Sequence, residues 1–335
     1  MEGLDNNTTE MRALSGKEVL ITGGTGTLGK ALLKELSAYS LKGLRVFSRD
    51  EFKQWKMREE YKETLEKANF PVAFFLGDVR DPARLKQAFK GVDVVIHTAA
   101  MKQVPACEYN PFEAIQTNIL GTENVCRVAI ETGVRHVMFI STDKAVYPIN
   151  LYGATKATAE KTVIASNVYS PNTTKFNVCR YGNVIGSRGS VVELFNEQIE
   201  NGQALTITDK RMTRFWITST FMAKFILKAI GTDSKETIFV PFMKGAPIMQ
   251  IAKVVAGEKI KQIPPIREIG IRKGEKLHEC LISEEETLST KVGSFCYLIQ
   301  NKELPMGEAL IESLTSEQAP ELLDKELEGM IYGKV

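Results

Sequence analysis

Tyr152 and Lys156 are residue types that can carry acid–base chemistry, and their spacing of four places both on one face of a predicted helix. A free tyrosine has a pKa of about 10, which is too high for a base at neutral pH. A nearby ammonium group and a cationic cofactor ring would lower the pKa of Tyr152. Thr142, at the end of a predicted strand, completes a candidate catalytic group. The alternative is an exposed helical tyrosine and lysine without a chemical role.

A glycine-rich turn follows the first predicted strand and precedes a predicted helix. Its glycines allow a tight turn, close approach of the backbone to a pyrophosphate, and close packing of the helix on the strand. The free N–H groups of the helix N-terminus also favour phosphate. A plain glycine turn is the alternative, but the position between strand and helix favours dinucleotide binding. The predicted cofactor contacts in this turn are Gly23, Thr25, Gly26, Thr27, Leu28 and Gly29.

The second predicted strand ends in Ser48 and Arg49, where a residue that binds the adenosine ribose is expected. Arginine suits a 2′-phosphate, so NADP is favoured over NAD. Alternatively, this segment is a solvated helix start that Asp50 caps. Asp78 either accepts a hydrogen bond from the adenine amino group or caps the next helix. The cofactor residues predicted outside the glycine turn are Ser48, Arg49, Asp50, Lys53, Asp78, Val79, Ala99, Ala100, Lys102, Tyr152 and Lys156.

Short apolar runs alternate with amphipathic segments in the first half of the chain. The strands are predicted at 18–22, 44–48, 72–76, 93–97, 136–141 and 175–180. The helices are predicted at 27–39, 51–68, 82–89, 111–133 and 151–168. This alternation predicts the α/β class, with a doubly wound Rossmann-type parallel sheet and a smaller C-terminal substrate lobe at its carboxyl edge.

The regular alternation of predicted strands and helices ends after about residue 182, and this change sets the predicted domain boundaries. Residues 1–15 are predicted to be a flexible leader, and residues 16–182 an NADP-binding Rossmann domain. Residues 183–290 are assigned mainly to a substrate-binding lobe, and residues 291–335 to a C-terminal extension. Residues 315–335 are predicted to form an exposed, charged helix.

Composition excludes several classes of function. The 43 Lys and Arg residues nearly balance 41 Asp and Glu residues, which gives no reason to expect a nucleic acid or an anionic membrane as partner. No apolar run reaches the roughly 18 residues that span a bilayer, and the polar N-terminus lacks the features of a secretory signal. The five dispersed cysteines and three separated histidines indicate a reducing cytoplasm and no metal centre.

Longer motifs resemble a known family. The Thr-Gly-Gly-Thr-Gly turn and Tyr-x-x-x-Lys resemble the extended short-chain dehydrogenase/reductases. More specifically, the chain resembles the soluble UDP-N-acetylglucosamine 4,6-dehydratases, and within them the 5-inverting enzymes that begin pseudaminic acid synthesis. The resemblance covers about residues 16–285. The motifs that carry it are 48–54, 77–81, 141–145, 148–156, 180–190 and 211–216.

The resemblance implies a mechanism in which the Asp143–Lys144 pair distinguishes a dehydratase from an epimerase. Tyr152 removes the proton of the 4-hydroxyl group while hydride leaves carbon 4 for NADP. Lys144 then takes the proton from carbon 5, and Asp143 protonates the departing 6-hydroxyl group. Hydride returns to carbon 6, so the cofactor is regenerated. The alternative for Asp143 and Lys144 is an ion pair in a surface turn.

The resemblance also implies residues that hold the substrate, UDP-N-acetylglucosamine. Arg272 would bind its pyrophosphate with a forked guanidinium, and Glu275 a ribose hydroxyl group; a solvated basic loop is the alternative. Three positions depart from the family: Gln103 replaces His, Lys273 replaces Pro, and Tyr147 is larger than usual. The complete substrate set is Lys102, Asn183, Val184, Arg188, Val191, Thr208, Arg272 and Glu275.

Three other functions remain open. They are a 5-retaining dehydratase with the same substrate, a UDP-N-acetylhexosamine 4-epimerase, and a non-enzymatic NADP-sensing protein of the same fold. The presence of both Tyr152 and Lys156 argues against the sensor. The resemblance further implies a homo-oligomer, from dimer to hexamer.

Overall fold

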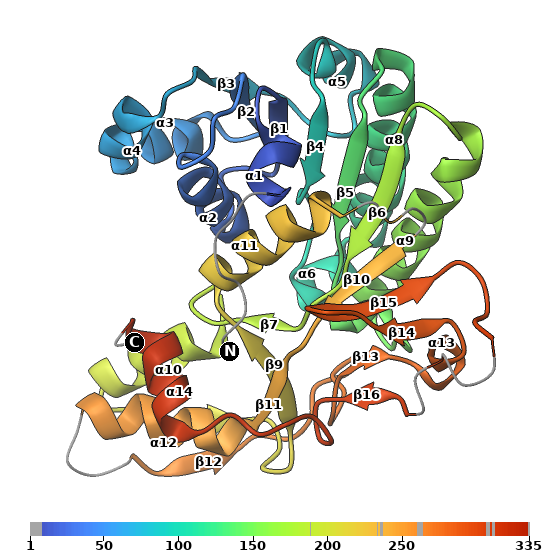
Figure 1. The fold of residues 1–335 in the computed structure, drawn as a ribbon. Helices are drawn as coiled ribbons and strands as arrows, with labels where there is room; N and C mark the ends of the chain where they lie inside the picture. Colours follow the sequence, from blue (N-terminus) through green and yellow to red (C-terminus); the bar gives the residue numbers. More distant parts are fainter. Residues whose placement is uncertain are drawn as a thin grey trace.

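A computed structural model describes residues 9–333 except 188, 233, 235–236, 260–263, 306–308 and 310–311. In this part of the chain, nine strands form one large sheet in the order β14-β15-β10-β6-β5-β4-β1-β2-β3 (Figure 1). The strands from β3 to β10 run parallel, and β14 and β15 are antiparallel. Their bounds are β1 Glu18–Thr22, β2 Gly43–Ser48, β3 Val72–Leu76, β4 Val94–His97, β5 His136–Ile140, β6 Lys175–Cys179, β10 Thr237–Pro241, β14 Thr290–Val292 and β15 Cys296–Gln300.

Helices cover both faces of this sheet, as the sequence predicted for a doubly wound fold (Figure 1). Side chains alternate along β1, so Val19 and Ile21 pack in one apolar core and Leu20 packs in the other. The first core includes α2 (Thr27–Leu36) and α11 (Ser219–Ile230). The second core includes α5 (Pro82–Phe89), α8 (Gly121–Thr132) and α9 (Leu151–Tyr169). The outer strands β2 and β3 are connected by α3 (Glu51–Glu60) and α4 (Lys62–Lys67).

A smaller lobe lies beyond the carboxyl edge of the sheet, at the bottom of Figure 1. Its apolar core joins three helices to short strands. The lobe helices are α10 (Val191–Glu200), α12 (Ile248–Lys259) and α14 (Asp324–Tyr332). The strands pair as β7 (Asn183–Val184) and β11 (Lys244–Pro247) with β9 (Thr213–Ile217), β8 (Leu205–Ile207) with β12 (Ile266–Glu268), and β13 (Cys280–Ile282) with β16 (Leu314–Thr315).

Short helical segments connect these layers near the sheet edge. They are α6 (Val104–Tyr109), α7 (Pro111–Ile115), the π-helical turn Gln116–Leu120, the 3₁₀ turn Asp143–Ala145 and α13 (Glu284–Thr287). The single helix predicted at 111–133 is therefore divided by a π-helical turn, and the helix predicted at 51–68 is divided into α3 and α4.

The ends of the chain differ from the prediction. In the predicted leader, residues Thr9–Leu14 form α1, whose Leu14 is fully buried in the core beside α11. In the predicted C-terminal extension, β15 pairs antiparallel with β10 and so extends the main sheet. The expected exposed helix at 315–335 is shorter, and Leu327 of α14 is buried in the lobe core.

The chain also crosses between sheet and lobe more often than predicted. α11 and β10 lie within 183–290 but belong to the Rossmann layers, because α11 packs on α2 and β10 pairs with β6. Within the described residues, no helix is both long enough and apolar enough to cross a membrane.

Candidate active site

The glycine turn between β1 and α2 has the geometry of a phosphate cradle. Gly23 has a φ of +66°, and a Cβ there would lie 2.8 Å from the Cα atom of Ala99. A Cβ on Gly29 would overlap the carbonyl oxygen of Gly24, so α2 packs directly on the turn. Gly26 caps α2 and has no side chain to cover the helix N-terminus. The residues present therefore fit a dinucleotide pyrophosphate.

Two residues that follow β2, Arg49 and Asp50, have different roles in the structure. Asp50 caps α3 by accepting a hydrogen bond from the Lys53 N–H group at 2.9 Å, and its carboxylate lies 2.9 Å from Lys53 Nζ. Arg49 is 54% exposed, and its Nη1 lies 3.6 Å from Asp78 Oδ2. The capping alternative is thus correct for Asp50, while Arg49 remains accessible to a ribose phosphate.

Asp78 does not cap the next helix, because Asp81 accepts the hydrogen bond from the Arg84 N–H group there. Its carboxylate instead receives the Arg80 guanidinium at 2.8 and 3.0 Å. Burial alone would raise the pKa of Asp78, but hydrogen bonds from Arg80 and the charge of Arg49 outweigh burial and lower it. Asp78 is therefore an ionised acceptor at the edge of the predicted adenosine site.

The other predicted cofactor residues lie around this cradle with different exposure. Ala99 and Ala100 are half-buried after β4, and Thr25 and Leu28 are buried in the turn. Val79 faces the second core, where its Cγ2 atom would lie 2.8 Å from a Cβ on Gly121. Only the backbone of Val79 is thus placed for a cofactor contact, since its side chain packs in the core.

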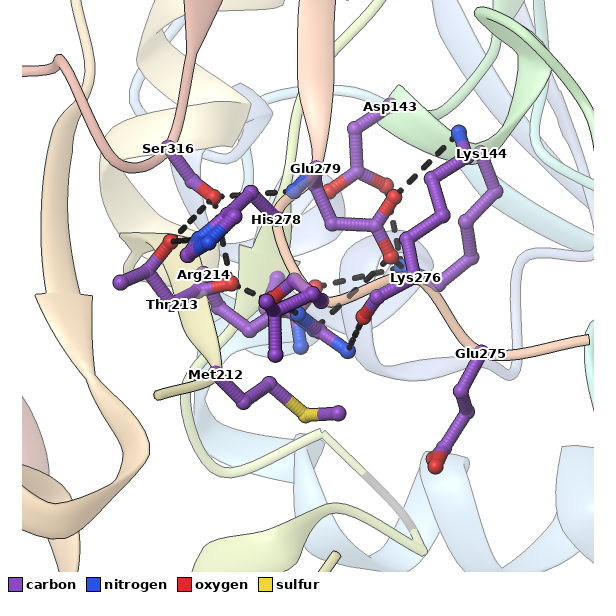
Figure 2. Close-up of polar contacts among 12 residues, drawn as sticks. Asp143, Lys144, Met212, Thr213, Arg214, Glu275, Lys276, His278, Glu279 and Ser316 are labelled. Carbon is purple, nitrogen blue, oxygen red and sulfur yellow. Dashed lines mark hydrogen bonds and ion pairs between the residues drawn. The ribbon is translucent and has the colours of Figure 1, made fainter. Parts of the chain in front are cut away.

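Asp143 and Lys144 form a buried ion pair at the carboxyl end of β5 (Figure 2). The Asp143 side chain is fully buried, and its Oδ1 atom accepts hydrogen bonds from Lys144 Nζ at 3.0 Å and from the Thr142 hydroxyl group at 2.9 Å. The Lys144 side chain is 24% exposed. The alternative of an ion pair in a surface turn is therefore wrong.

Sequence reasoning missed a second carboxylate beside Lys144. Glu279 Oε1 lies 3.3 Å from Lys144 Nζ and 3.7 Å from Arg214 Nε, and its Oε2 lies 3.6 Å from Lys276 Nζ (Figure 2). Glu279 comes from the segment before β13, far along the chain from Asp143. Its spacing to other acidic residues gave no local signal, because the contact depends on how the lobe covers the sheet edge.

The cluster moves the pKa values of its two carboxyl groups in opposite directions. Burial raises the pKa of Asp143, and the charge of Glu279 adds to this effect against Lys144. Burial would also raise the pKa of Glu279, but Lys144, Arg214 and Lys276 outweigh it and lower the value. For Lys144, the two carboxylates outweigh burial and raise the pKa of the ammonium group. The cluster therefore favours a negatively charged Glu279. It also favours retention of one proton that either Asp143 or Lys144 can carry.

Tyr152 and Lys156 share the buried face of α9, as predicted. Lys156 Nζ donates a hydrogen bond to the Ile140 carbonyl oxygen at 2.5 Å and lies 3.8 Å from the centre of the Phe139 ring. Burial lowers the pKa of Lys156 to about 7, partly opposed by Glu160.

Several protein groups act on the pKa of Tyr152. Burial raises it to about 12, although the charge of Lys144 and a hydrogen bond with Thr142 act in the opposite direction. Lys144 is therefore a nearby ammonium group that stabilises a tyrosinate at this position.

The predicted substrate residues are only partly brought together. Asn183 Oδ1 accepts a hydrogen bond from Lys144 Nζ at 3.3 Å, so Asn183 belongs to the catalytic cluster. The Arg272 N–H group donates to Glu275 Oε2 at 3.3 Å in an exposed turn before Glu279. Thr208 contacts Met212 Sδ at 3.3 Å in the lobe. The remaining residues of this set are Val184 in β7, Val191 at the start of α10, exposed Lys102 before α6, and Arg188, which lies outside the described residues.

The three departures from the family pattern have different surroundings. Tyr147 is a non-glycine residue with a φ of +44°; its hydroxyl group donates to Glu285 Oε2 at 2.7 Å and accepts from the Glu284 N–H group at 3.1 Å. Tyr147 therefore connects the catalytic loop to α13. Gln103 lies beside Gly189, whose added Cβ would meet Gln103 Nε2 at 2.8 Å, and Lys273 is exposed.

The cluster contains cations and carboxylates but no arrangement typical of a metal site. No group of three or more His, Cys, Asp or Glu side chains that could hold a metal ion occurs among the residues that the structure describes.

A doubly wound sheet, a glycine cradle at β1 and a Tyr-x-x-x-Lys helix together define the short-chain dehydrogenase/reductase class. Sequence comparison is consistent with this class. Residues 19–300 match the family described as "Polysaccharide biosynthesis protein", and the chain belongs to this family.

Known proteins with two different activities resemble the chain. It is 45% identical to a UDP-N-acetylglucosamine 4,6-dehydratase (inverting) of Campylobacter jejuni subsp. jejuni serotype O:23/36, over 82% of this chain and 79% of that protein. It is 44% identical to a UDP-glucose 4-epimerase of Rickettsia canadensis, over 81% of this chain and 79% of that protein. The solved structure of Pen from Bacillus thuringiensis is 36% identical, with a TM-score of 0.87 over 96% of this chain and 99% of Pen.

Proposed function

We propose that the protein is an NADP-dependent UDP-N-acetylglucosamine 4,6-dehydratase, a hydro-lyase that inverts carbon 5. The buried Asp143–Lys144 pair beside Tyr152 carries this proposal. An epimerase needs one base and a hydroxyl group, whereas a dehydratase needs a second acid–base pair near the sugar. The relative named as an inverting dehydratase supports the same choice.

The cofactor would be held by the glycine turn, by Arg49 and by Lys156. The exposed guanidinium of Arg49 supports NADP, because a forked cation suits a 2′-phosphate. A bound nicotinamide would supply the hydride chemistry of the reaction, the oxidation of carbon 4 and the reduction of carbon 6. The Lys156 ammonium group lies over the Phe139 ring and donates a hydrogen bond to the Ile140 carbonyl oxygen. In this position it would hold the nicotinamide ribose.

The acid–base steps are assigned to three side chains. Tyr152 removes the proton of the 4-hydroxyl group, and the charge of Lys144 stabilises the tyrosinate. Transfer of one proton along the 3.0 Å hydrogen bond from Lys144 to Asp143 gives a neutral amine and a carboxylic acid. The amine of Lys144 then takes the proton from carbon 5, and Asp143 gives its proton to the departing 6-hydroxyl group, which leaves as water. The pair thus loses one proton and gains one. As carbon 6 is reduced, one proton returns to carbon 5, which balances the proton that Tyr152 took from the 4-hydroxyl group.

The substrate would extend from this cluster into the lobe. Asn183 lies beside Lys144 and would orient the sugar. Arg272 would bind the pyrophosphate and Glu275 a ribose hydroxyl group. The product would be a UDP-2-acetamido-2,6-dideoxy-4-hexulose for a pseudaminic acid-like surface glycan. We place the enzyme in the cytoplasm as a homo-oligomer, from dimer to hexamer.

A 4-epimerase is the second candidate, and the Rickettsia relative named UDP-glucose 4-epimerase favours it. A 5-retaining dehydratase is a variant of the first candidate. All three use Tyr152, but only the dehydratases need Asp143 and Lys144 as an acid and a base.

Proton NMR of the full-length protein with NADP and UDP-N-acetylglucosamine in heavy water separates the candidates. We expect a new methyl signal, with deuterium and inverted configuration at carbon 5. Lys144→Ala should lower this rate by about 10²–10⁴-fold, while the control Lys67→Ala, at a position 79% exposed on α4, should not change it. A 4-epimer without a methyl signal, or undiminished dehydration by Lys144→Ala, would contradict the proposal.

A further inference from the structure

Glu279 occupies the centre of the charged cluster, and the backbone fixes its direction. Its N–H group donates to Ser316 Oγ at 2.9 Å, and the Ser316 N–H group donates to its carbonyl oxygen at 2.8 Å. Ser316 is in turn hydrogen-bonded to Thr213 of β9 at 2.8 Å (Figure 2). These bonds join β9, the residues after β16 and the segment before β13, so the Glu279 side chain is aimed at Lys144.

The charged groups around Glu279 come from three segments. Lys144 and Asp143 face it from the 3₁₀ turn, Arg214 from β9, and Lys276 from its own segment. Tyr152 and Tyr181 interact electrostatically with Asp143. A carboxylate that is only 3% exposed would be costly if isolated. Three cations offset that cost here, so Glu279 remains charged inside the site.

Among the residues that the structure describes, two carboxylate oxygens of the cluster lack a hydrogen-bond donor. In the described part of the chain, the buried Asp143 Oδ2 and Glu279 Oε2 atoms accept no hydrogen bond. Buried acceptors are normally satisfied in a purely structural cluster. Glu279 Oε2 instead lies 3.6 Å from Lys276 Nζ, so its charge is offset by a cation within the cluster.

We infer that Glu279 is a positioning residue for dehydration: it holds the Lys144 amine beside Asp143 and supplies the fixed negative charge that keeps one proton shared between them. The inference rests on the roles proposed for Asp143 and Lys144. It assigns no contact between Glu279 and the sugar.

The electrostatic consequence has a definite sign. The negative charge of Glu279 raises the pKa values of both Asp143 and Lys144. The pair therefore keeps its shared proton to a higher pH than it would without Glu279. Since a pair that has lost this proton has no acid for the 6-hydroxyl group, removal of the Glu279 charge moves the basic limb of the pH–rate profile to lower pH.

Initial rates of methyl formation, measured against substrate concentration and pH, test this inference in the full-length protein with NADP. Glu279→Gln keeps the size of the side chain and removes its charge. We expect kcat to fall by about 10- to 100-fold, with KM little changed and the basic limb at lower pH. The control is Glu317→Gln, which should leave kcat and the pH profile unchanged. Glu317 is 64% exposed and pairs with His278, the residue before Glu279.

Unchanged kcat and pH profile in Glu279→Gln, or a change in KM alone, would overturn the inference. If Glu279→Gln does not fold, Glu279→Asp is the second variant. It keeps the negative charge but moves the carboxylate away from Lys144. We expect a lower kcat and a basic limb at the same pH as in the wild type. A wild-type kcat in Glu279→Asp would also overturn the inference. Failure of the proposed function is distinct, because the wild-type protein would then form no methyl product.

Discussion

The Asn150 side-chain amide donates a hydrogen bond to the Gly274 carbonyl oxygen at 2.8 Å and so joins the catalytic helix to the segment that carries Arg272 and Glu275. The same side chain caps α9, because its Oδ1 atom accepts from the Gly153 N–H group at 2.8 Å. One residue therefore fixes both the start of the helix that bears Tyr152 and the position of the predicted nucleotide-binding turn.

Two substitutions separate these two roles of Asn150. Asn150→Asp keeps the helix cap and removes the donor to Gly274, so it should raise KM for UDP-N-acetylglucosamine with little change in thermal stability. Asn150→Ala removes both bonds and should also lower the free energy of unfolding by about 1 kcal/mol. Steady-state kinetics and thermal unfolding check both results. Equal KM values in Asn150→Asp and the wild type would show that the contact with Gly274 does not position the turn.

Arg49 should determine the preference for NADP. Loss of a charge-assisted hydrogen bond costs about 1.5–3 kcal/mol, so Arg49→Ala should weaken NADP binding by about 10- to 100-fold and leave NAD binding nearly unchanged. Titration calorimetry with each dinucleotide measures the difference. Lys56→Ala, at an exposed position in α3, is the control. Equal weakening of both cofactors would contradict a specific contact with the 2′-phosphate.

Gly29 and Gly257 give a matched pair of glycine substitutions. A Cβ at Gly29 would overlap the Gly24 backbone, so Gly29→Ala should lower the free energy of unfolding by about 1–3 kcal/mol and weaken cofactor binding. Gly257 lies in α12 with open space around its Cβ position, and Gly257→Ala should stabilise the protein by about 0.5–1 kcal/mol. Denaturant unfolding compares them. Equal effects of both substitutions would rule out a steric requirement at Gly29.

Glu286 should make stability depend on pH. Arg180 is buried between Glu160 and Glu286, with contacts of 2.6 and 2.8 Å. Burial would raise the pKa of Glu286, but hydrogen bonding and the charge of Arg180 outweigh it and lower the pKa below 4.5. The contribution of Glu286 to the free energy of unfolding is therefore present above about pH 4.5, and it is lost as the pH falls through the folded-state pKa.

Glu286→Gln should consequently lower the free energy of unfolding by about 1–3 kcal/mol at neutral pH. The difference from the wild type should shrink as the pH falls below about 4.5. Denaturant unfolding across this range measures it, with Glu63→Gln, at an 89% exposed position, as the control. A difference that stays constant with pH would contradict a role for the Glu286 charge.

Several local features could be predicted because they depend on neighbours in the sequence. The first six strands begin and end within one residue of the prediction, since their apolar runs are short and bounded by turn residues. The glycine turn, the cap at Asp50 and the shared face of Tyr152 and Lys156 depend on contacts within a few residues. The order of β15 and β10 in the sheet could not be predicted, because pairing of strands far apart in sequence depends on which sheet edge remains open.

The sequence by itself therefore determined the Rossmann-type alternation, the phosphate-binding turn and the residue types available for acid–base chemistry. Only the tertiary structure decided that Asp143 is fully buried, that Glu279 lies beside Lys144, and that Lys144 is an ammonium group acting on the pKa of Tyr152. The physical reason is that burial and electrostatic fields depend on the distant segments that cover a residue. Here the segment before β13 covers the end of β5, and a sequence pattern does not contain that contact.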